Sequence, residues 1–135
     1  MTRLSGKWVI VCLAFAFLQT PAAKAFDLNG AWASDGSACD KIFQVKNKVI
    51  SIRRDSDLYG SGFIVEGDQL RGKVAKCAVK SRKEDGQLTH LIAVCSTDIA
   101  LSTVQFSIRA DSDNQLTRVF PGLPEMSVSY MRCRL

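Results

Sequence analysis

Two strand-like runs flank an acidic turn in residues 76–96, whose sequence is KCAVKSRKEDGQLTHLIAVCS. The turn contains Asp85-Gly86, and such pairs are typical of tight β-hairpins because they tolerate the positive φ angles that these turns need. A chain that folds back there brings Cys77 and Cys95 opposite, or nearly opposite, each other across the two strands. The segment therefore predicts a β-hairpin bridged by a Cys77–Cys95 disulfide.

The number and spacing of the cysteines predict a second bridge. Four of the five cysteines lie downstream of residue 25, at positions separated by 38, 18 and 38 residues. Zinc sites usually pair two cysteines within a few residues, so this spacing indicates disulfides rather than a metal site. With Cys77 paired to Cys95, Cys39 remains for Cys133, and that bridge would join the beginning of the domain to its last strand. Two disulfides are typical of a small domain in an oxidising compartment.

The first 25 residues have the features of a secretory signal peptide. Two basic residues within positions 1–7 precede eleven apolar residues at 8–18, and Ala23 and Ala25 supply the small side chains of a cleavage site. The apolar run is too short to span a bilayer. We expect cleavage after Ala25, a single domain at 26–135 without a transmembrane segment, and a periplasmic or secreted location.

The net charge of the chain depends on this leader. Residues 1–25 hold three of the 18 Lys+Arg residues and none of the 13 Asp+Glu residues, so the formal charge falls from +5 to +2 without them. A charge this small argues against a polycation built to bind nucleic acid. We expect no nucleic-acid partner and no cofactor, and we expect a monomer.

Short runs in which apolar and polar residues alternate recur along the rest of the chain. Such runs, separated by Gly, Asp and Asn turns, indicate an all-β fold: a small antiparallel barrel or sandwich of about eight strands. In residues 76–82 the alternation turns Cys77 and Val79 inward and Lys80 and Arg82 outward. The strand-like runs are 42–45, 49–53, 62–66, 69–74, 76–82, 88–96, 103–110, 115–120 and 126–134.

The tripeptide Gly30-Ala31-Trp32 stands at the beginning of this set of strands. A G-x-W at the start of an all-β exported domain resembles the opening of the calycin barrels, which include lipocalins, avidins and the bacterial metalloprotease inhibitors of the Inh type. The resemblance implies that an arginine near the last strand stacks on Trp32 and closes the floor of the barrel. Arg132 and Arg134 are the candidates for that role.

Two features limit which calycin-like function we expect. Trp32 is the only tryptophan after the leader, whereas avidin-type biotin pockets need further tryptophans from later strands, so we do not expect biotin binding. In the Inh-type inhibitors an N-terminal segment enters the protease cleft. Residues 26–29 are available for that role here.

The sequence therefore favours an exported, non-catalytic binding module that holds a small apolar or amphipathic ligand inside its barrel. The expected ligand-binding residues are large apolar side chains assigned to the interior. They are Trp32, Phe43, Phe63, Phe106 and Ile108.

The alternative is a periplasmic protein-interaction module, such as a protease or lysozyme inhibitor. It would act through a terminus, through the loop at 120–126, or through a basic face that also suits acidic glycans or phosphates. A solvated sheet surface that keeps the strand edges from pairing is the favoured explanation of the same basic residues. They are Arg71, Lys73, Lys76, Lys80 and Arg82.

No residue pattern predicts catalysis or metal binding. His90 is the only histidine, and the sequence does not place a nucleophile or a carboxylate beside it. Asp55, Asp57 and Glu66 approach the spacing of a calcium-binding loop, but Tyr59 occupies a ligand position and the flanks are strand-like. We therefore expect no enzyme activity, no catalytic residue and no metal.

Overall fold

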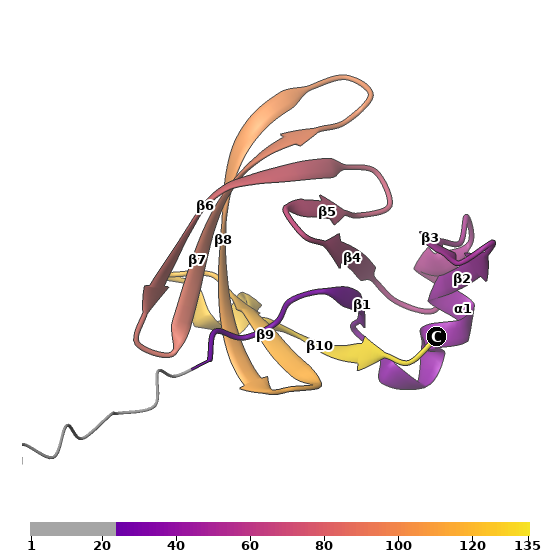
Figure 1. Cartoon of the computed structure of the whole chain (residues 1–135), viewed down its shortest axis with the longest axis horizontal. Helices are drawn as coiled ribbons and strands as arrows, with labels where there is room; N and C mark the ends of the chain where they lie inside the picture. Colours follow the sequence, from indigo (N-terminus) through magenta and orange to yellow (C-terminus); the bar gives the residue numbers. More distant parts are fainter. Residues whose placement is uncertain (1–23) are drawn as a thin grey trace, which may run out of the picture.

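The computed structural model describes residues 24–135, so the expected signal peptide lies outside the described residues except for its last two. Eight antiparallel strands close into a barrel (Figure 1), which confirms the all-β prediction and selects a barrel over a sandwich. In order around the barrel they are β1 (Gly30–Ala33), β10 (Val128–Cys133), β9 (Gln115–Val119), β8 (Leu101–Ser112), β7 (Leu88–Ser96), β6 (Lys76–Asp85), β5 (Gln69–Arg71) and β4 (Gly62–Glu66).

A small excursion interrupts the barrel between β1 and β4, and Figure 1 shows it at one side of the molecule. It contains the one-turn helix α1 (Cys39–Ile42) and a separate two-stranded sheet of β2 (Phe43–Lys46) and β3 (Val49–Ile52). Asn47 and Lys48 join these strands with φ angles of 51° and 63°, the left-handed conformation of a type I′ hairpin turn. Three 3₁₀ turns, Gly36–Ala38, Ser56–Leu58 and Pro124–Met126, complete the fold.

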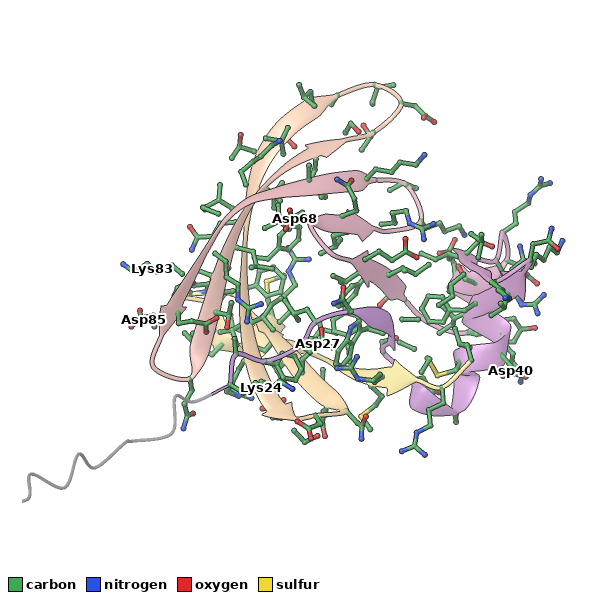
Figure 2. All side chains as sticks on the ribbon, viewed as in Figure 1. Lys24, Asp27, Asp40, Asp68, Lys83 and Asp85 are labelled. Atoms are coloured by element: carbon green, nitrogen blue, oxygen red, sulfur yellow. A yellow bond between two sulfur atoms is a disulfide. The ribbon has the colours of Figure 1, made fainter. Side chains whose placement is uncertain are left out.

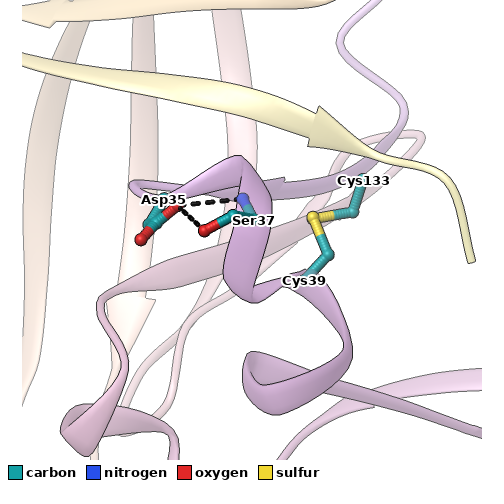
Figure 3. The surroundings of a disulfide bond; sticks show 4 residues. All are labelled: Asp35, Ser37, Cys39 and Cys133. Atoms are coloured by element: carbon teal, nitrogen blue, oxygen red, sulfur yellow. Dashed lines mark hydrogen bonds between the residues drawn. A yellow bond between two sulfur atoms is a disulfide. The ribbon is translucent and has the colours of Figure 1, made fainter.

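Both predicted disulfides are present. Cys77 and Cys95 are direct partners in the β6–β7 register, with Cα atoms 4.0 Å apart. Cys39 at the start of α1 is bonded to Cys133 at the end of β10, and this bridge ties the excursion to the barrel (Figure 3). In the turn that precedes Cys39, the Asp35 carboxylate accepts hydrogen bonds from the hydroxyl and the backbone N–H of Ser37, and these bonds lower the pKa of Asp35.

The apolar side chains form two cores, one on each face of β1. Trp32 points into the barrel, whereas its neighbours Ala31 and Ala33 point outward beneath the excursion. Phe43 belongs to this second core, together with Ile42 and the side chain of Ile64. The expectation that Phe43 lines the barrel interior is therefore wrong, because the excursion covers the outer face of β1 and β4 and supplies its own apolar residues.

A β-bulge in β6 overturns a second expectation. The pairing with β7 shifts between Val79 and Ser81, so Lys80 is an extra residue and the alternation of faces changes phase after it. Arg82 consequently pairs with Leu91, a barrel-core residue, and lies on the inner face. The prediction that Arg82 points outward is wrong for this reason.

No helix among the described residues has the length and apolarity needed to cross a bilayer.

Candidate ligand-binding cavity

One end of the barrel opens into an apolar cavity of about 350 Å³. In an antiparallel meander alternate connections lie at the same end, so the loops 72–75, 97–100 and 120–127 surround this opening. Figure 1 shows the β7–β8 connection at this end, opposite the β6–β7 and β8–β9 connections. The lining includes Gly72, Ala75 and Thr97 from these loops, which places the mouth of the cavity among them.

The walls of the cavity are mostly apolar. Three of the five interior residues expected from the sequence line it, namely Phe63, Phe106 and Ile108, whereas Trp32 lies deeper in the same core. The Cys77–Cys95 disulfide forms part of the wall. The remaining lining residues are Gly62, Leu70, Ser102, Val104, Leu116, Arg118 and Tyr130.

Arg118 is the one charged side chain in this lining. Strand β9 turns Leu116 into the barrel, Thr117 outward and Arg118 inward, as its period-two alternation requires. The guanidinium carbon lies 4.8 Å from the ring centre of Phe106 and 4.7 Å from that of Phe120, so two cation–π contacts hold it. Within residues 24–135, no carboxylate lies within ion-pair distance of Arg118.

The opposite end of the barrel is closed by Trp32 and Arg132. The Arg132 guanidinium stacks 4.2 Å from the ring centre of Trp32, which confirms the arginine contact that the calycin resemblance implies. The Trp32 indole N–H donates to the carbonyl of Leu28 at 2.8 Å. Trp32 is completely buried, so this pair forms part of the floor of the barrel.

Residues 26–29 lie against that floor as an extended strap. Their four consecutive carbonyls accept hydrogen bonds from side chains of the barrel: in order, from Arg82, Arg132, Trp32 and again Arg132. The side-chain amide oxygen of Asn29 accepts a further bond from the backbone of the β4–β5 turn. This end keeps a smaller cavity of about 140 Å³, which the strap itself lines.

The five basic residues do not form one free cationic face. Three of them are ion-paired: Arg71, Lys73 and Arg82 with Glu66, Asp57 and Glu84 respectively. Lys76 and Lys80 remain exposed on β6. Asp57 and Glu66, which approach the spacing of a calcium-binding loop, therefore form ion pairs with basic side chains. Within residues 24–135, no group of three His, Cys, Asp or Glu residues is arranged to hold a metal ion.

His90 lies on the outer face of β7 between a serine and an aspartate. Its Nδ1 is 2.8 Å from the Ser107 hydroxyl, and its Nε2 is 3.6 Å from the carboxylate of Asp85, at the far end of β6 in Figure 2. Serine, histidine and aspartate are the residue types of the catalytic triad of serine hydrolases. However, Ser107 is only 3% exposed and neither barrel-end cavity is lined by any of the three, so the arrangement is best explained as a polar pairing across strands.

Sequence reasoning missed Arg118 as a residue of the cavity lining and Phe120 as a ring that contacts it. The available signal was the alternation Leu116-Thr117-Arg118, which assigns Arg118 to the same face as Leu116. A charged residue at an inward position is costly unless it is compensated, so the pattern alone does not favour that assignment. The compensation comes from the two aromatic rings, one of which lies outside any strand.

Comparison of the chain with family models, with curated proteins and with solved structures finds no match.

Proposed function

We propose that this protein is a non-catalytic binding module that holds one small, largely apolar ligand in the cavity of its barrel. The observation that carries this proposal is the apolar cavity of about 350 Å³ at the open end. Ligand sites in proteins are typically concave, about 300–1,000 Å³ in volume, and apolar with a few polar groups that orient the ligand. The cavity meets each of these criteria.

The two ends of the barrel support the same proposal. The floor of Trp32 and Arg132, with the strap 26–29 bound across it, closes one end. The other end admits a ligand between three loops. A ligand that enters there removes apolar surface from water on both partners, which is favourable by about 25 cal/mol per Å² of apolar area.

We further propose that the barrel is calycin-like and that the protein is exported. The first proposal rests on Gly30-Ala31-Trp32, on the arginine stacked over that tryptophan, and on eight antiparallel strands in a closed barrel. The second rests on the two disulfides, which persist in oxidising compartments, and on the leader-like residues 1–25.

The test uses two neighbouring residues of β8 that face opposite ways. Val104 lines the cavity, whereas Gln105 is exposed on the outside. We expect the neutral fluorophore 1-aminoanthracene to bind the native protein saturably with one site. Val104→Trp should weaken binding by about tenfold or more because the new ring fills the cavity, a loss of about 1.4 kcal/mol, and Gln105→Trp should leave it unchanged.

Absence of saturable binding to the native protein would refute the proposal. Equal losses in the two variants would also refute it, because binding would then not occur inside the barrel. Circular dichroism of each variant checks that the barrel is retained. A complementary readout is reduction of the Cys77–Cys95 bridge by a water-soluble phosphine, which a ligand in the cavity should slow.

The second candidate function is a protein-interaction module such as a protease or lysozyme inhibitor. It is favoured by exposed apolar side chains at the open end: Val74 is 77%, Ile99 96% and Leu101 74% exposed. Large exposed apolar residues that lie together are typical of contact surfaces. The N-terminal form of this candidate is disfavoured, because all four carbonyls of the strap 26–29 are already bound to the barrel.

Inhibition assays with a lysozyme and with a secreted metalloprotease test this second candidate directly. If it is correct, the protein inhibits one of them and Ile99→Asp abolishes the inhibition, since a charge replaces the most exposed apolar group of the rim. The same variant should leave 1-aminoanthracene binding intact, because Ile99 does not line the cavity.

A further inference from the structure

We infer that the ligand of the barrel is an amphiphile with a single carboxylate, and that Arg118 binds this carboxylate at the mouth of the cavity. The inference rests on the proposed ligand-binding function and deepens it by naming the chemical class of the ligand. It begins from the charge balance of the cavity. Among the described residues, its lining contains one cation and no acidic residue.

Arg118 has unfilled hydrogen-bonding capacity. A guanidinium has five N–H donors in one plane. Phe106 and Phe120 contact it through their rings, which stabilise the charge but do not accept those five bonds in the way that oxygen atoms do. No hydrogen bond from this side chain occurs to any residue within 24–135, whereas Arg132, which also stacks on an aromatic ring, donates to three backbone carbonyls.

Arg118 lies near the open end of the barrel. It is the next-to-last residue of β9, and its partner in β10 is Val128, the first residue of that strand. The guanidinium is therefore held near the open end, while Leu116, two residues earlier, lies deeper and is fully buried. A ligand with its charge at the mouth and its apolar body toward Leu116 satisfies both environments.

A tyrosine lies on the same wall of the cavity as Arg118. Tyr130 pairs with Leu116 across β9 and β10, so it lies diagonal to Arg118 on the inner face, at the separation where long side chains still share a ligand. Tyr130 lines the cavity, and its hydroxyl makes no hydrogen bond to any of the described residues, so it is free to donate to a ligand. A carboxylate accepts two parallel bonds from an arginine and retains lone pairs for a further donor.

The test compares acids with neutral amides of the same shape. By calorimetry we would measure 1-naphthoate against 1-naphthamide and octanoate against octanamide, with the intact native protein and with Arg118→Met. The native protein should prefer the acid of at least one pair by about 10- to 100-fold, the range expected for a charge-assisted hydrogen-bonded pair. A preference for the acid within the naphthyl pair indicates that the ligand has a flat aromatic body, whereas a preference within the octyl pair indicates that it has an extended chain.

Arg118→Met should abolish the preference for the acid and still bind the neutral amide, which shows that the cavity remains intact. Arg118→Lys should restore part of the preference, because it returns the charge without the planar fork. Arg109→Met is the matched control: it removes an arginine from the neighbouring strand, where the side chain is paired with Asp111, and should leave the preference unchanged.

The outcomes separate this inference from the function on which it rests. Failure of the native protein to bind either member of either pair would contradict the proposed function itself. Binding of acids and amides with equal affinity would overturn the inference and leave the binding module standing. A preference that survives Arg118→Met, or that Arg109→Met removes equally, would also overturn the role of Arg118.

Discussion

Replacing Arg132 by methionine should destabilise the closed end of the barrel by an amount that the structure allows us to work out. The guanidinium stacks on Trp32, which is fully buried, and a cation–π contact of this kind is worth about 1–2 kcal/mol. It also donates hydrogen bonds to the carbonyls of Asp27, Asn29 and Asp113. Each contributes about 0.5–1 kcal/mol net, because water replaces part of it. Since methionine keeps apolar cover over the ring, we expect Arg132→Met to lower the free energy of unfolding by about 2–4 kcal/mol.

Urea unfolding followed by tryptophan fluorescence measures this loss at the site itself. In a Trp8→Phe background Trp32 is the only tryptophan of the chain, so its emission reports on the closed end. With an m value of about 1.5 kcal/mol/M, a loss of about 3 kcal/mol moves the midpoint by about 2 M urea. Arg134→Met, which removes the exposed neighbouring arginine, is the control. A loss below about 1 kcal/mol, or an equal loss in the control, would refute the assignment of the floor to Arg132.

Two further predictions concern packing and pH. Gly62→Ala should lower the free energy of unfolding by about 1–3 kcal/mol, because the added Cβ would lie 2.7 Å from the Phe43 ring and 2.9 Å from the Trp32 carbonyl oxygen. Chemical denaturation measures this loss, and an unchanged midpoint would contradict the close approach of these strands. The Thr89 hydroxyl donates to the Glu84 carboxylate at 2.6 Å and is the largest cause of the lowered pKa of Glu84. Because the pKa of Glu84 is lower in the folded protein than its value of about 4.3 in the unfolded chain, its carboxylate stabilises the fold above that pH, and the stabilisation is lost as the pH falls. The native protein should therefore be more stable than Thr89→Val by the largest amount near neutral pH, and the difference should shrink below about pH 4. An advantage that stays constant from neutral to acidic pH would count against this bond.

The amino-acid sequence alone was sufficient for those features of the fold that depend on local patterns or on covalent pairing. Alternation of apolar and polar residues predicts the strands, and Asp85-Gly86 predicts the turn, where Gly86 indeed has a φ of 58°. Once that hairpin is placed, the pairing of Cys77 with Cys95 follows from geometry, and the remaining bridge follows by elimination. The stacking of an arginine on Trp32 was implied by the resemblance of Gly30-Ala31-Trp32 to the opening of calycin barrels, which left Arg132 and Arg134 as candidates, and the structure selects Arg132.

Only the tertiary structure decided which face of each strand meets which core. The bulge at Lys80 reverses the phase of β6 and turns Arg82 inward, and no local signal distinguishes a bulge from continued alternation. The residues between β1 and β4 fold over the outside of those strands, so Phe43 packs against their outer face instead of entering the barrel. Alternation already assigns Arg118 to the face of Leu116, but only the closed barrel brings the ring of Phe106, from β8, against its guanidinium. In each case the position of a side chain is set by contacts with distant strands, and a period-two pattern read along one strand carries no information about what covers each of its faces.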